Sequence, residues 1–188
     1  MDKKNTVPRS QSFLSTYDIA VIALSAAMIT VCSWISVPTL VPFTLQTFAV
    51  FAVAGLFGMK RGTFAMGVYL ALAAIGLPVL SGFKGGFDKL VGVTGGYIVG
   101  FVFIALIVGF VSERTGRKAI PLALSMLLGL AVCYAFGTAW FMLVYTRANG
   151  AVGLGTVLGW CVLPFLLPDC VKIACAVVIC NRVGKYVK

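Results

Sequence analysis

The stretch "IPLALSMLLGLAVCYAFGTAWFMLVY", Ile120 to Tyr145, contains no charged residue. A membrane-spanning helix needs roughly 20 consecutive, mostly apolar residues, and this run exceeds that length. It is continuously apolar, whereas the strands of a membrane barrel alternate apolar and polar residues. A helix also satisfies its own backbone hydrogen bonds in hydrocarbon. The stretch therefore predicts an α-helix that crosses a membrane.

Five further apolar segments flank this one, with charged or turn-rich connectors between them. They run from Ile19 to Ile35, from about Phe43 to Met59, from Thr63 to about Leu77, from about Tyr97 to Val111, and from near Thr156 to near Cys180. The sequence thus predicts an all-α integral membrane protein with six transmembrane helices in a single membrane domain, residues 1–188. Within it we expect a cytoplasmic tail at 1–17, a six-helix bundle at 18–181 and a cytoplasmic tail at 182–188.

The composition agrees with this prediction. Of the 188 residues, 61% are hydrophobic and 11% are charged, which lies outside the usual range of a soluble globular domain. In a soluble protein, 15 Lys and Arg against 5 Asp and Glu would suggest nucleic-acid binding. Here the charges lie in short connectors, so we expect a lipid bilayer around the chain and no nucleic-acid partner.

Several classes of function lack the residues they need. The chain has no histidine, the commonest metal ligand and proton shuttle, and its six cysteines form no CxxC pair, so we expect no metal and no cofactor. No nucleophile and base stand at a catalytic spacing, so we expect no enzyme and no catalytic residues. No GxxxxGK[ST] motif is present, so transport driven by ATP would need another subunit to supply the ATPase.

Basic residues in the connectors predict the orientation. Placing the N-terminus in the cytoplasm puts eleven basic residues inside and three outside, a strong positive-inside bias. The eleven are Lys3, Lys4, Arg9, Lys60, Arg61, Arg114, Arg117, Lys118, Arg182, Lys185 and Lys188, and the three are Lys84, Lys89 and Arg147. Both termini are therefore expected in the cytoplasm.

The outer connector from Gly76 to Gly96 is too apolar for a solvated linker. Its glycines allow tight turns, and burial of Phe83, Phe87, Leu90 and Val91 would suit their side chains. We expect a loop that caps a cavity from outside.

Asp169 and Lys172 stand three residues apart in the last apolar segment, "PFLLPDCVKIACAVVIC". This spacing puts them on one helical face, and charges at such depth usually pair or line a pathway. They form either a structural ion pair or the polar floor of a site for a small solute. Pro168 would suit the first turn of a helix, which would place Asp169 near a helix N-terminus, where the dipole favours a carboxylate.

Three weaker patterns accompany the charged pair. "TLQTF" places Thr44, Gln46 and Thr47 after a Pro-containing loop, and the Gln46 amide needs partners for both its donor and its acceptor in hydrocarbon. "TGGY", Thr94 to Tyr97, is a Gly-rich entry into a helix that either binds an anion or simply makes a tight turn. "ALSAA" sets Ala23 and Ala27 at the small-xxx-small spacing on which another helix can approach.

Taken together, "VPFTLQTFAV", "GLPVLSGFKGGFDKLVGVTGGYIVGF" and "PFLLPDCVKIACA" resemble the BioY family, the biotin-binding membrane subunits of energy-coupling-factor (ECF) vitamin transporters. The resemblance runs in order from about Asp18 to Cys180. It implies a six-helix substrate-capture protein, the S component, in the cytoplasmic membrane of a prokaryote. It also implies three partners besides the bilayer: biotin, a transmembrane coupling (T) subunit, and a pair of cytoplasmic ATPase subunits.

The resemblance implies roles for individual residues. Those assigned to substrate binding are Asp169, Lys172, Gln46, Thr44, Thr94, Gly95, Gly96 and Tyr97. Ala23 and Ala27 are assigned to docking on the coupling subunit. The chain also departs from the family pattern at Val93, at Leu167 and Pro168, and in an outer loop made bulkier and more charged by Phe83, Lys84, Asp88 and Lys89.

Biotin has an apolar bicyclic body, a ureido group with two donors and one acceptor, and a negatively charged valerate tail. We expect Asp169 to accept from the ureido N–H groups, Gln46 to add a neutral hydrogen bond, and Lys172 to pair with either Asp169 or the valerate. The alternative is a self-sufficient proton-coupled carrier in which Asp169 takes up and releases the proton, although a paired Lys172 would hold Asp169 ionised. A third hypothesis is a membrane scaffold that binds no solute.

Overall fold

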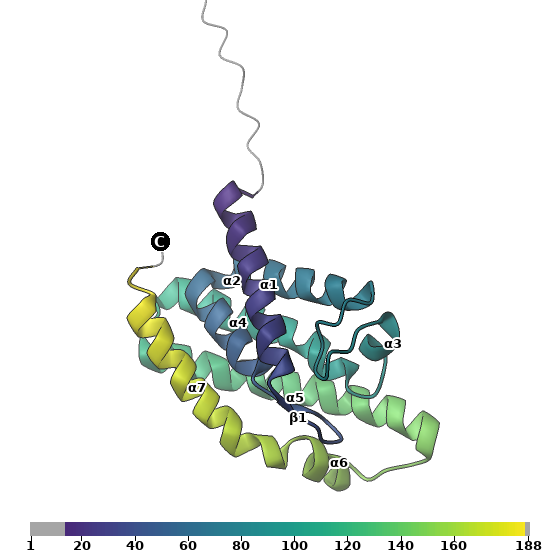
Figure 1. The fold of residues 1–188 in the computed structure, drawn as a ribbon. Coiled ribbons are helices and arrows are strands. Elements are labelled where there is room, and N and C mark those ends of the chain that lie inside the picture. The colour runs from purple at the N-terminus through teal and green to yellow at the C-terminus, as the bar shows by residue number, and fades with distance from the viewer. Residues whose placement is uncertain (1–13, 187–188) are drawn as a thin grey trace, which may run out of the picture.

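A computed structural model describes residues 14–186 and consists of helices with one short two-stranded sheet (Figure 1). The elements are α1 (Thr16–Trp34), β1 (Ser36–Val37), β2 (Phe43–Thr44), α2 (Gln46–Ala74), α3 (Phe87–Leu90), α4 (Gly95–Thr115), α5 (Ala119–Asn149), α6 (Leu154–Cys161) and α7 (Leu163–Val183). Helices α1, α2, α4, α5 and α7 are long and apolar enough to cross a membrane. The predicted all-α membrane fold is confirmed, and residues 1–13 and 187–188 of the expected tails lie outside the described part.

Helix α2 contains both the second and the third predicted segments. It is interrupted at Gly58, whose φ of 81° and ψ of −175° are not helical and favour glycine. The two legs of α2 run in different directions from this point (Figure 1). They also touch, because a Cβ atom on Gly62 would lie 3.1 Å from the Cα of Ala54. The five long helices therefore supply six apolar segments, as expected from the sequence.

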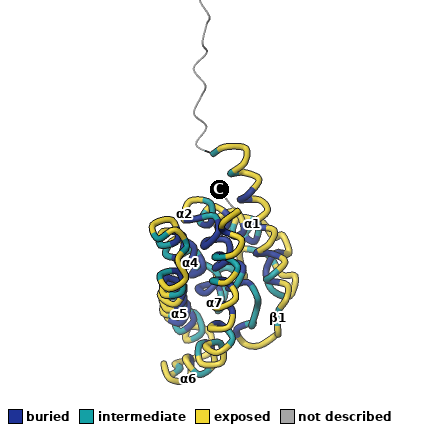
Figure 2. The backbone as a smooth tube through the Cα atoms, turned by 90° about the vertical axis from the view of Figure 1, so that its left-hand side faces the viewer, coloured by how far each residue is buried: buried dark blue, intermediate teal, exposed yellow. Residues whose placement is uncertain are grey.

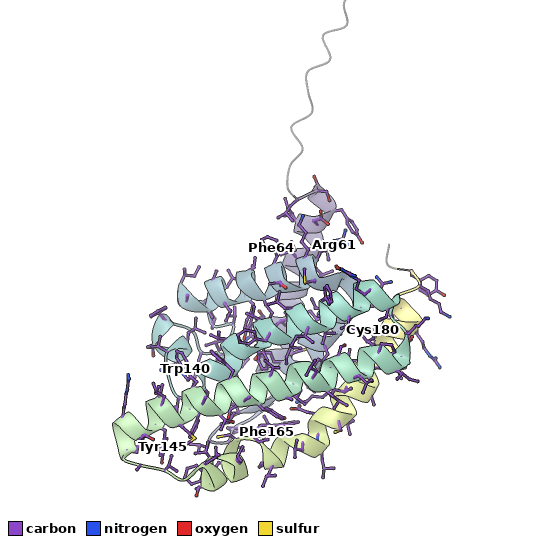
Figure 3. All side chains as sticks on the ribbon, turned by 180° about the vertical axis from the view of Figure 1, so that it is seen from behind. Arg61, Phe64, Trp140, Tyr145, Phe165 and Cys180 are labelled. Atoms are coloured by element: carbon purple, nitrogen blue, oxygen red, sulfur yellow. The ribbon has the colours of Figure 1, made fainter. Side chains whose placement is uncertain are left out.

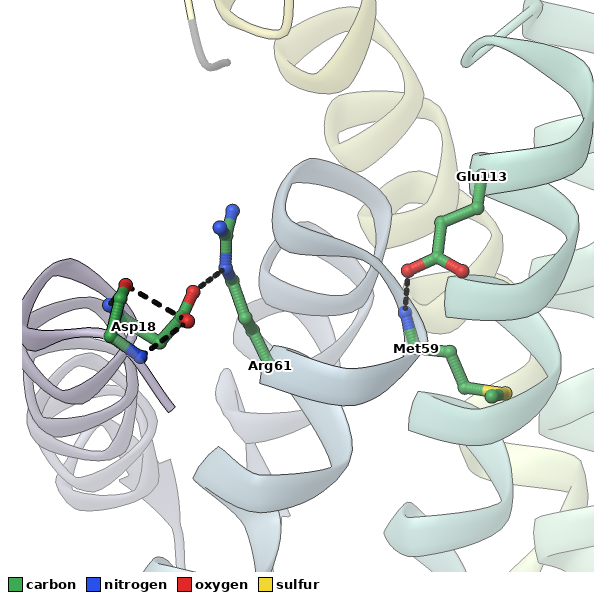
Figure 4. A network of polar contacts seen from close by, with 5 residues as sticks. Asp18, Met59, Arg61 and Glu113 are labelled. Carbon is green, nitrogen blue, oxygen red and sulfur yellow. Dashed lines mark hydrogen bonds and ion pairs between the residues drawn. The ribbon is translucent and has the colours of Figure 1, made fainter. Parts of the chain in front are cut away.

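The end of α4 satisfies the backbone groups that the break in α2 leaves unpaired. Ser112 Oγ donates to the carbonyl of Gly55 at 2.6 Å, and Arg117 Nη2 donates to the carbonyl of Leu56 at 2.7 Å. The Met59 N–H donates to Glu113 Oε1 at 2.9 Å (Figure 4). Such pairing is needed because an unsatisfied backbone group in or beside hydrocarbon costs several kcal/mol.

The two ends of the bundle differ in charge and in shape. Arg61, beside the break in α2, pairs with Asp18 at the start of α1 at 2.7 Å (Figure 4). Arg117, between α4 and α5, donates to the carbonyl of Gly184 after α7. These contacts bring the basic connectors together at one end, with the start of α1 and the end of α7 (Figure 1). The β1–β2 hairpin, α3 and α6 lie at the other end.

The helices bury one apolar face and expose another. In α1, Ile22, Ala26 and Ile29 are buried, whereas Leu24 is 71% exposed on the opposite side. Exposed residues run along the outer sides of the helices in Figure 2, and buried ones face inward. Because the exposed surface is also apolar, this is the pattern of a bundle surrounded by lipid. The central cluster includes the fully buried side chains Tyr69, Phe51, Ile29, Met66, Ile104 and Met126.

The expected position of Asp169 near a helix N-terminus is wrong. Helix α7 begins at Leu163, with Pro164 in its first turn and Pro168 inside it. Pro164 takes the terminal position because no hydrogen bond is lost there, whereas Pro168 gives up the bond to the Pro164 carbonyl and its ring crowds that carbonyl. Asp169 therefore lies within the helix, more than one full turn after its start at Leu163.

The predicted burial is wrong for Phe83, Phe87 and Val91 of the outer connector, whereas Leu90 is half-buried and packs on the central cluster. Phe83 and Phe87 are 65% and 66% exposed, and Val91 is 44% exposed. Phe83 packs instead on Trp34, at the end of α1, with the ring centroids 4.9 Å apart. Trp34 Nε1 in turn donates to the carbonyl of Pro78 at 2.8 Å. Aromatic side chains at helix ends are typical of the membrane–water interface, and the loop is buried through Val79 and Leu80 instead.

Candidate substrate-binding site

A cavity of about 670 Å³, counted to its open mouth, lies between the outer hairpin, the Gly76–Gly96 segment and helices α2, α4, α5, α6 and α7. Its lining is mostly apolar with a few polar groups, as is usual for ligand pockets. Six residues predicted for the site line it: Thr44, Gln46, Thr94, Tyr97, Asp169 and Lys172. Segments far apart in the sequence thus line a single cavity.

The charged pair is buried, and both side chains are held by neighbouring groups. Lys172 Nζ lies 2.7 Å from Asp169 Oδ1, and the two side chains are 6% and 3% exposed. The same ammonium donates to the carbonyl oxygen of Thr44 at 2.7 Å and lies 4.1 Å from the centroid of the Phe43 ring. Burying two ions is tolerated only when geometry and further hydrogen bonds compensate for their lost hydration. The hairpin strand β2 supplies both of these additional contacts.

Tyr134 on α5 was not predicted for the site. Its hydroxyl donates to Asp169 Oδ2 at 2.5 Å, so each carboxylate oxygen receives one hydrogen bond. Since a carboxylate has about four lone-pair sites, acceptor capacity remains for a ligand. The signal in the sequence was weak: a tyrosine in the middle of an apolar helix needs a partner for its hydroxyl, but nothing in the sequence identifies that partner.

Gln46 is the first residue of α2 and is 4% exposed. Its side-chain amide lies beside the hydroxyl of Tyr69, yet Nε2 is buried and makes no hydrogen bond to any described residue. Such a donor is costly to leave unpaired. Because Gln46 lines the cavity, its amide is placed to donate to a polar group of a bound solute.

Of the four residues Thr94–Tyr97 at the start of α4, two line the cavity and two pack closely against neighbouring segments. Thr94 and Tyr97 line the cavity, and the Tyr97 hydroxyl lies 3.1 Å from Thr138 Oγ1. Gly95 and Gly96 do not line it. A Cβ atom on Gly96 would lie 2.3 Å from the Cβ of Trp140, and one on Gly95 would lie 1.8 Å from the Leu90 carbonyl oxygen. These glycines let α4 approach its neighbours.

The rest of the wall is mostly apolar and aromatic. It includes Phe101, Leu130 and Phe165, and the Phe165 ring lies 6.0 Å from that of Phe43. Figure 3 shows Phe165 on α7 and Tyr145 on α5 toward the same end of the bundle, opposite Arg61. An apolar wall over a small polar floor suits a solute with an apolar body and one compact polar group.

A second cavity, of about 910 Å³, continues outward from the first. Five residues line both: Pro42, Leu80, Ser81, Thr94 and Ile98. Lys84, Asp88 and Lys89 also line the outer cavity. Lys89 pairs with Asp88 at 2.7 Å, and its hydrogen bond holds the pKa of the Asp88 carboxyl below its usual value. We call this outer cavity the vestibule.

Ala23 and Ala27, the residues predicted for partner docking, lie outside the substrate-binding site. Both are exposed on the outer face of α1, and neither lines the cavity or the vestibule.

The chain is similar to known proteins over most of its length. The family model described as BioY family matches residues 3–188. The Thermotoga maritima protein named "Biotin transporter BioY" is 41% identical over 160 residues, which cover 85% of this chain and 90% of that protein. The Pyrococcus horikoshii protein named "Probable biotin transporter BioY" is 38% identical over 166 residues, covering 88% and 94%.

A solved structure is similar over nearly the same length. It is described as the S-component for biotin from an ECF-type ABC transporter. Its TM-score to this chain is 0.80 at 30% sequence identity, and the alignment covers 90% of this chain and 91% of the other. With the family model matching nearly all of its residues, this chain belongs to the BioY family.

Proposed function

We propose that this chain is the substrate-capture subunit, or S component, of an ECF-type biotin uptake transporter, and that it binds biotin in the cavity from the outer face. The observation that carries the proposal is the polar floor of the cavity. There the buried Asp169–Lys172 pair and the unpaired Gln46 Nε2 lie beneath an apolar wall. The names of the relatives and the similar S-component structure support biotin as the solute.

The floor suits the neutral ureido group of biotin. Asp169 retains acceptor capacity for the two ureido N–H groups, and Gln46 Nε2 is a donor for the ureido oxygen. Phe165, Phe101 and Leu130 would pack against the apolar rings. The contacts of Lys172 to Asp169 and Thr44 favour the first of its two expected roles, which is to pair with Asp169 and hold the carboxylate in position.

Uptake requires partners that supply energy. We propose a transmembrane coupling subunit and two cytoplasmic ATPase subunits, because the sequence has no GxxxxGK[ST] motif of its own. The exposed Ala23 and Ala27 on α1 form the surface proposed for docking on the coupling subunit.

The family is one of multi-pass membrane transporters rather than of enzymes. We propose one membrane domain in the cytoplasmic membrane of a prokaryote, with both termini in the cytoplasm. The collection of basic connectors at the end of the bundle that holds the start of α1 and the end of α7 supports this orientation. The carrier hypothesis is not favoured, since the similar proteins are biotin transporters of the BioY family and the similar structure is an ECF-type S-component.

Direct binding of labelled biotin to the purified chain in lipid nanodiscs tests the proposal. A capture subunit binds biotin without ATP and without a pH gradient. Desthiobiotin and an unrelated vitamin such as thiamine serve as competitors of graded similarity. A folded chain that binds no biotin under these conditions would overturn the proposal, and binding that appears only with a proton gradient would favour the carrier.

A further inference from the structure

We call the first cavity, which contains Asp169 and Lys172, the inner cavity. Its lining residues include no unpaired cation for an anionic group of a ligand. Asp169 and Lys172 are the only charged residues among those that line it, and they neutralise each other at 2.7 Å. A ligand carboxylate placed on this floor would add a second negative charge beside a single ammonium. Burying a charge without an opposite partner is strongly unfavourable. The anionic end of a solute that binds here must therefore lie elsewhere.

The vestibule offers the missing cation. It shares the wall formed by Leu80, Ser81 and Thr94 with the inner cavity, so the two cavities adjoin. Its charged lining residues are Lys84, Asp88 and Lys89. Lys89 and Asp88 pair with each other, whereas Lys84 makes no ion pair with any described residue. The vestibule thus carries one net positive charge, and Lys84 is the residue that provides it.

The backbone ties the turn that carries Lys84 to the wall that the two cavities share. The Leu80 N–H donates to the Lys84 carbonyl at 2.9 Å, and Leu80 is a buried residue that lines both cavities. Two residues later, the Gly86 N–H donates to the carbonyl of Ala73 in α2 at 2.7 Å. The turn that carries Lys84 is therefore tied on one side to the cavity wall and on the other to a membrane helix.

We propose that the vestibule is a carboxylate subsite in which Lys84 pairs with the anionic chain end of the ligand, while the inner cavity holds the neutral polar head. This inference rests on the proposed function, since biotin has a neutral ureido head and a carboxylate on a flexible chain. Because Lys84 is exposed, the ion pair contributes modestly, as surface pairs do. The subsite therefore gives a preference for the free acid over neutral derivatives rather than an absolute requirement.

The test compares biotin with biotin methyl ester, which keeps the head and loses the charge. Wild type should bind the acid about two- to fivefold more tightly than the ester at low salt. Lys84→Gln should remove this preference by weakening acid binding alone, and Lys84→Arg should keep it. Lys118→Gln is the matched control, because it makes the same charge change at the opposite end of the bundle. High salt should reduce the preference of the wild type and leave Lys84→Gln unaffected.

Three outcomes would overturn the subsite. The acid preference surviving in Lys84→Gln would mean that another group holds the carboxylate. Equal weakening of acid and ester would mean that Lys84 only supports the loop. Equal binding of acid and ester by the wild type would mean that the carboxylate meets no cation, while the proposed function would still hold. Failure of the wild type to bind either ligand would instead overturn the proposed function itself.

Discussion

Asp169 is held by donors from two helices, and one of these donors is itself fixed by the outer hairpin. Lys172 in α7 and Tyr134 in α5 donate to its two oxygens, and Lys172 is itself fixed by the Thr44 carbonyl. Each contact reduces the cost of burying a carboxylate in a membrane protein. The same contacts fix its orientation, so a ligand meets a carboxylate that is already held in position at the cavity wall.

Replacing this carboxylate tests its role. Asp169→Asn should weaken biotin binding by about tenfold to hundredfold, the equivalent of about 1.5–3 kcal/mol for a hydrogen bond that involves a charge. Lys172→Ala should weaken it at least as much, because it leaves Asp169 buried without its ion-pair partner. Isothermal titration calorimetry in detergent measures both changes.

The double variant separates binding from structure. If the two charges only stabilise each other, removing both should restore the thermal stability and much of the affinity. If they form the floor of the site, the double variant should be stable and still bind biotin poorly.

The hydroxyl of Tyr134 gives a second prediction. Tyr134→Phe removes one donor from Asp169 and should weaken biotin binding by about three- to tenfold, the usual range for one hydrogen bond. Tyr17→Phe, at the opposite end of the bundle, is the control. Unchanged affinity in Tyr134→Phe would mean that the ligand replaces the tyrosine hydroxyl as the donor.

Individual charged residues were easier to predict than their neutral partners. Asp169 and Lys172 stand out because charges are rare in apolar segments. Tyr134, Phe165 and Cys161 have the composition of ordinary membrane helices, so only the fold reveals that they line the cavity. Gly95 and Gly96 show the reverse, since a Gly-rich motif that suggested binding serves close packing against Leu90 and Trp140.

At the scale of elements, the break in α2 fixes how the bundle is connected. A Cβ atom on Gly58 would lie 2.1 Å from Glu113 Oε1, at a φ of 81° that side chains rarely adopt. Moving Glu113 away would leave the Met59 N–H without its acceptor. The glycine, the turn and the end of α4 therefore depend on one another.

Gly58→Ala should lower the melting temperature by about 5–10 °C, because backbone strain and a lost hydrogen bond together cost a few kcal/mol. Gly67→Ala lies in the second leg of α2, and a Cβ atom there would meet nothing within 4 Å. This control should leave the melting temperature unchanged or raise it slightly. Thermal unfolding in the same detergent compares the two, and equal melting temperatures would show that the break tolerates a side chain.

The sequence predicted where helices lie better than how they end. Apolar length and the short connector at Lys60–Gly62 indicated two segments in α2, and the break falls at Gly58, just before that connector. The start of α7 was misjudged because two prolines compete for the first turn, and local pattern cannot rank them. The outer aromatic side chains were misjudged because an exposed residue at the membrane interface has the same sequence signal as a buried one.

For the whole molecule, the separation of charge predicts its orientation. Asp88 lies in the outer segment and Lys118 in a basic connector, and both are exposed. In intact cells, a membrane-impermeant maleimide should label Asp88→Cys and should label Lys118→Cys only after the cells are opened. The parent protein measures labelling of the native cysteines. Labelling of Lys118→Cys alone in intact cells would reverse the proposed topology.

The exposed face of α1 separates capture from transport. Ala23 and Ala27 lie outside the cavity and the vestibule, so enlarging them leaves the biotin site intact while blocking close approach of a helix from the coupling subunit. Replacing both with leucine should leave biotin binding by the purified chain unchanged and reduce ATP-driven uptake in cells to background. Ala135 and Ala139 on α5 provide the matched control, since they are exposed at the same spacing and their replacement should preserve uptake. If uptake persists in the α1 variant at equal expression, the coupling subunit docks on another face of the bundle.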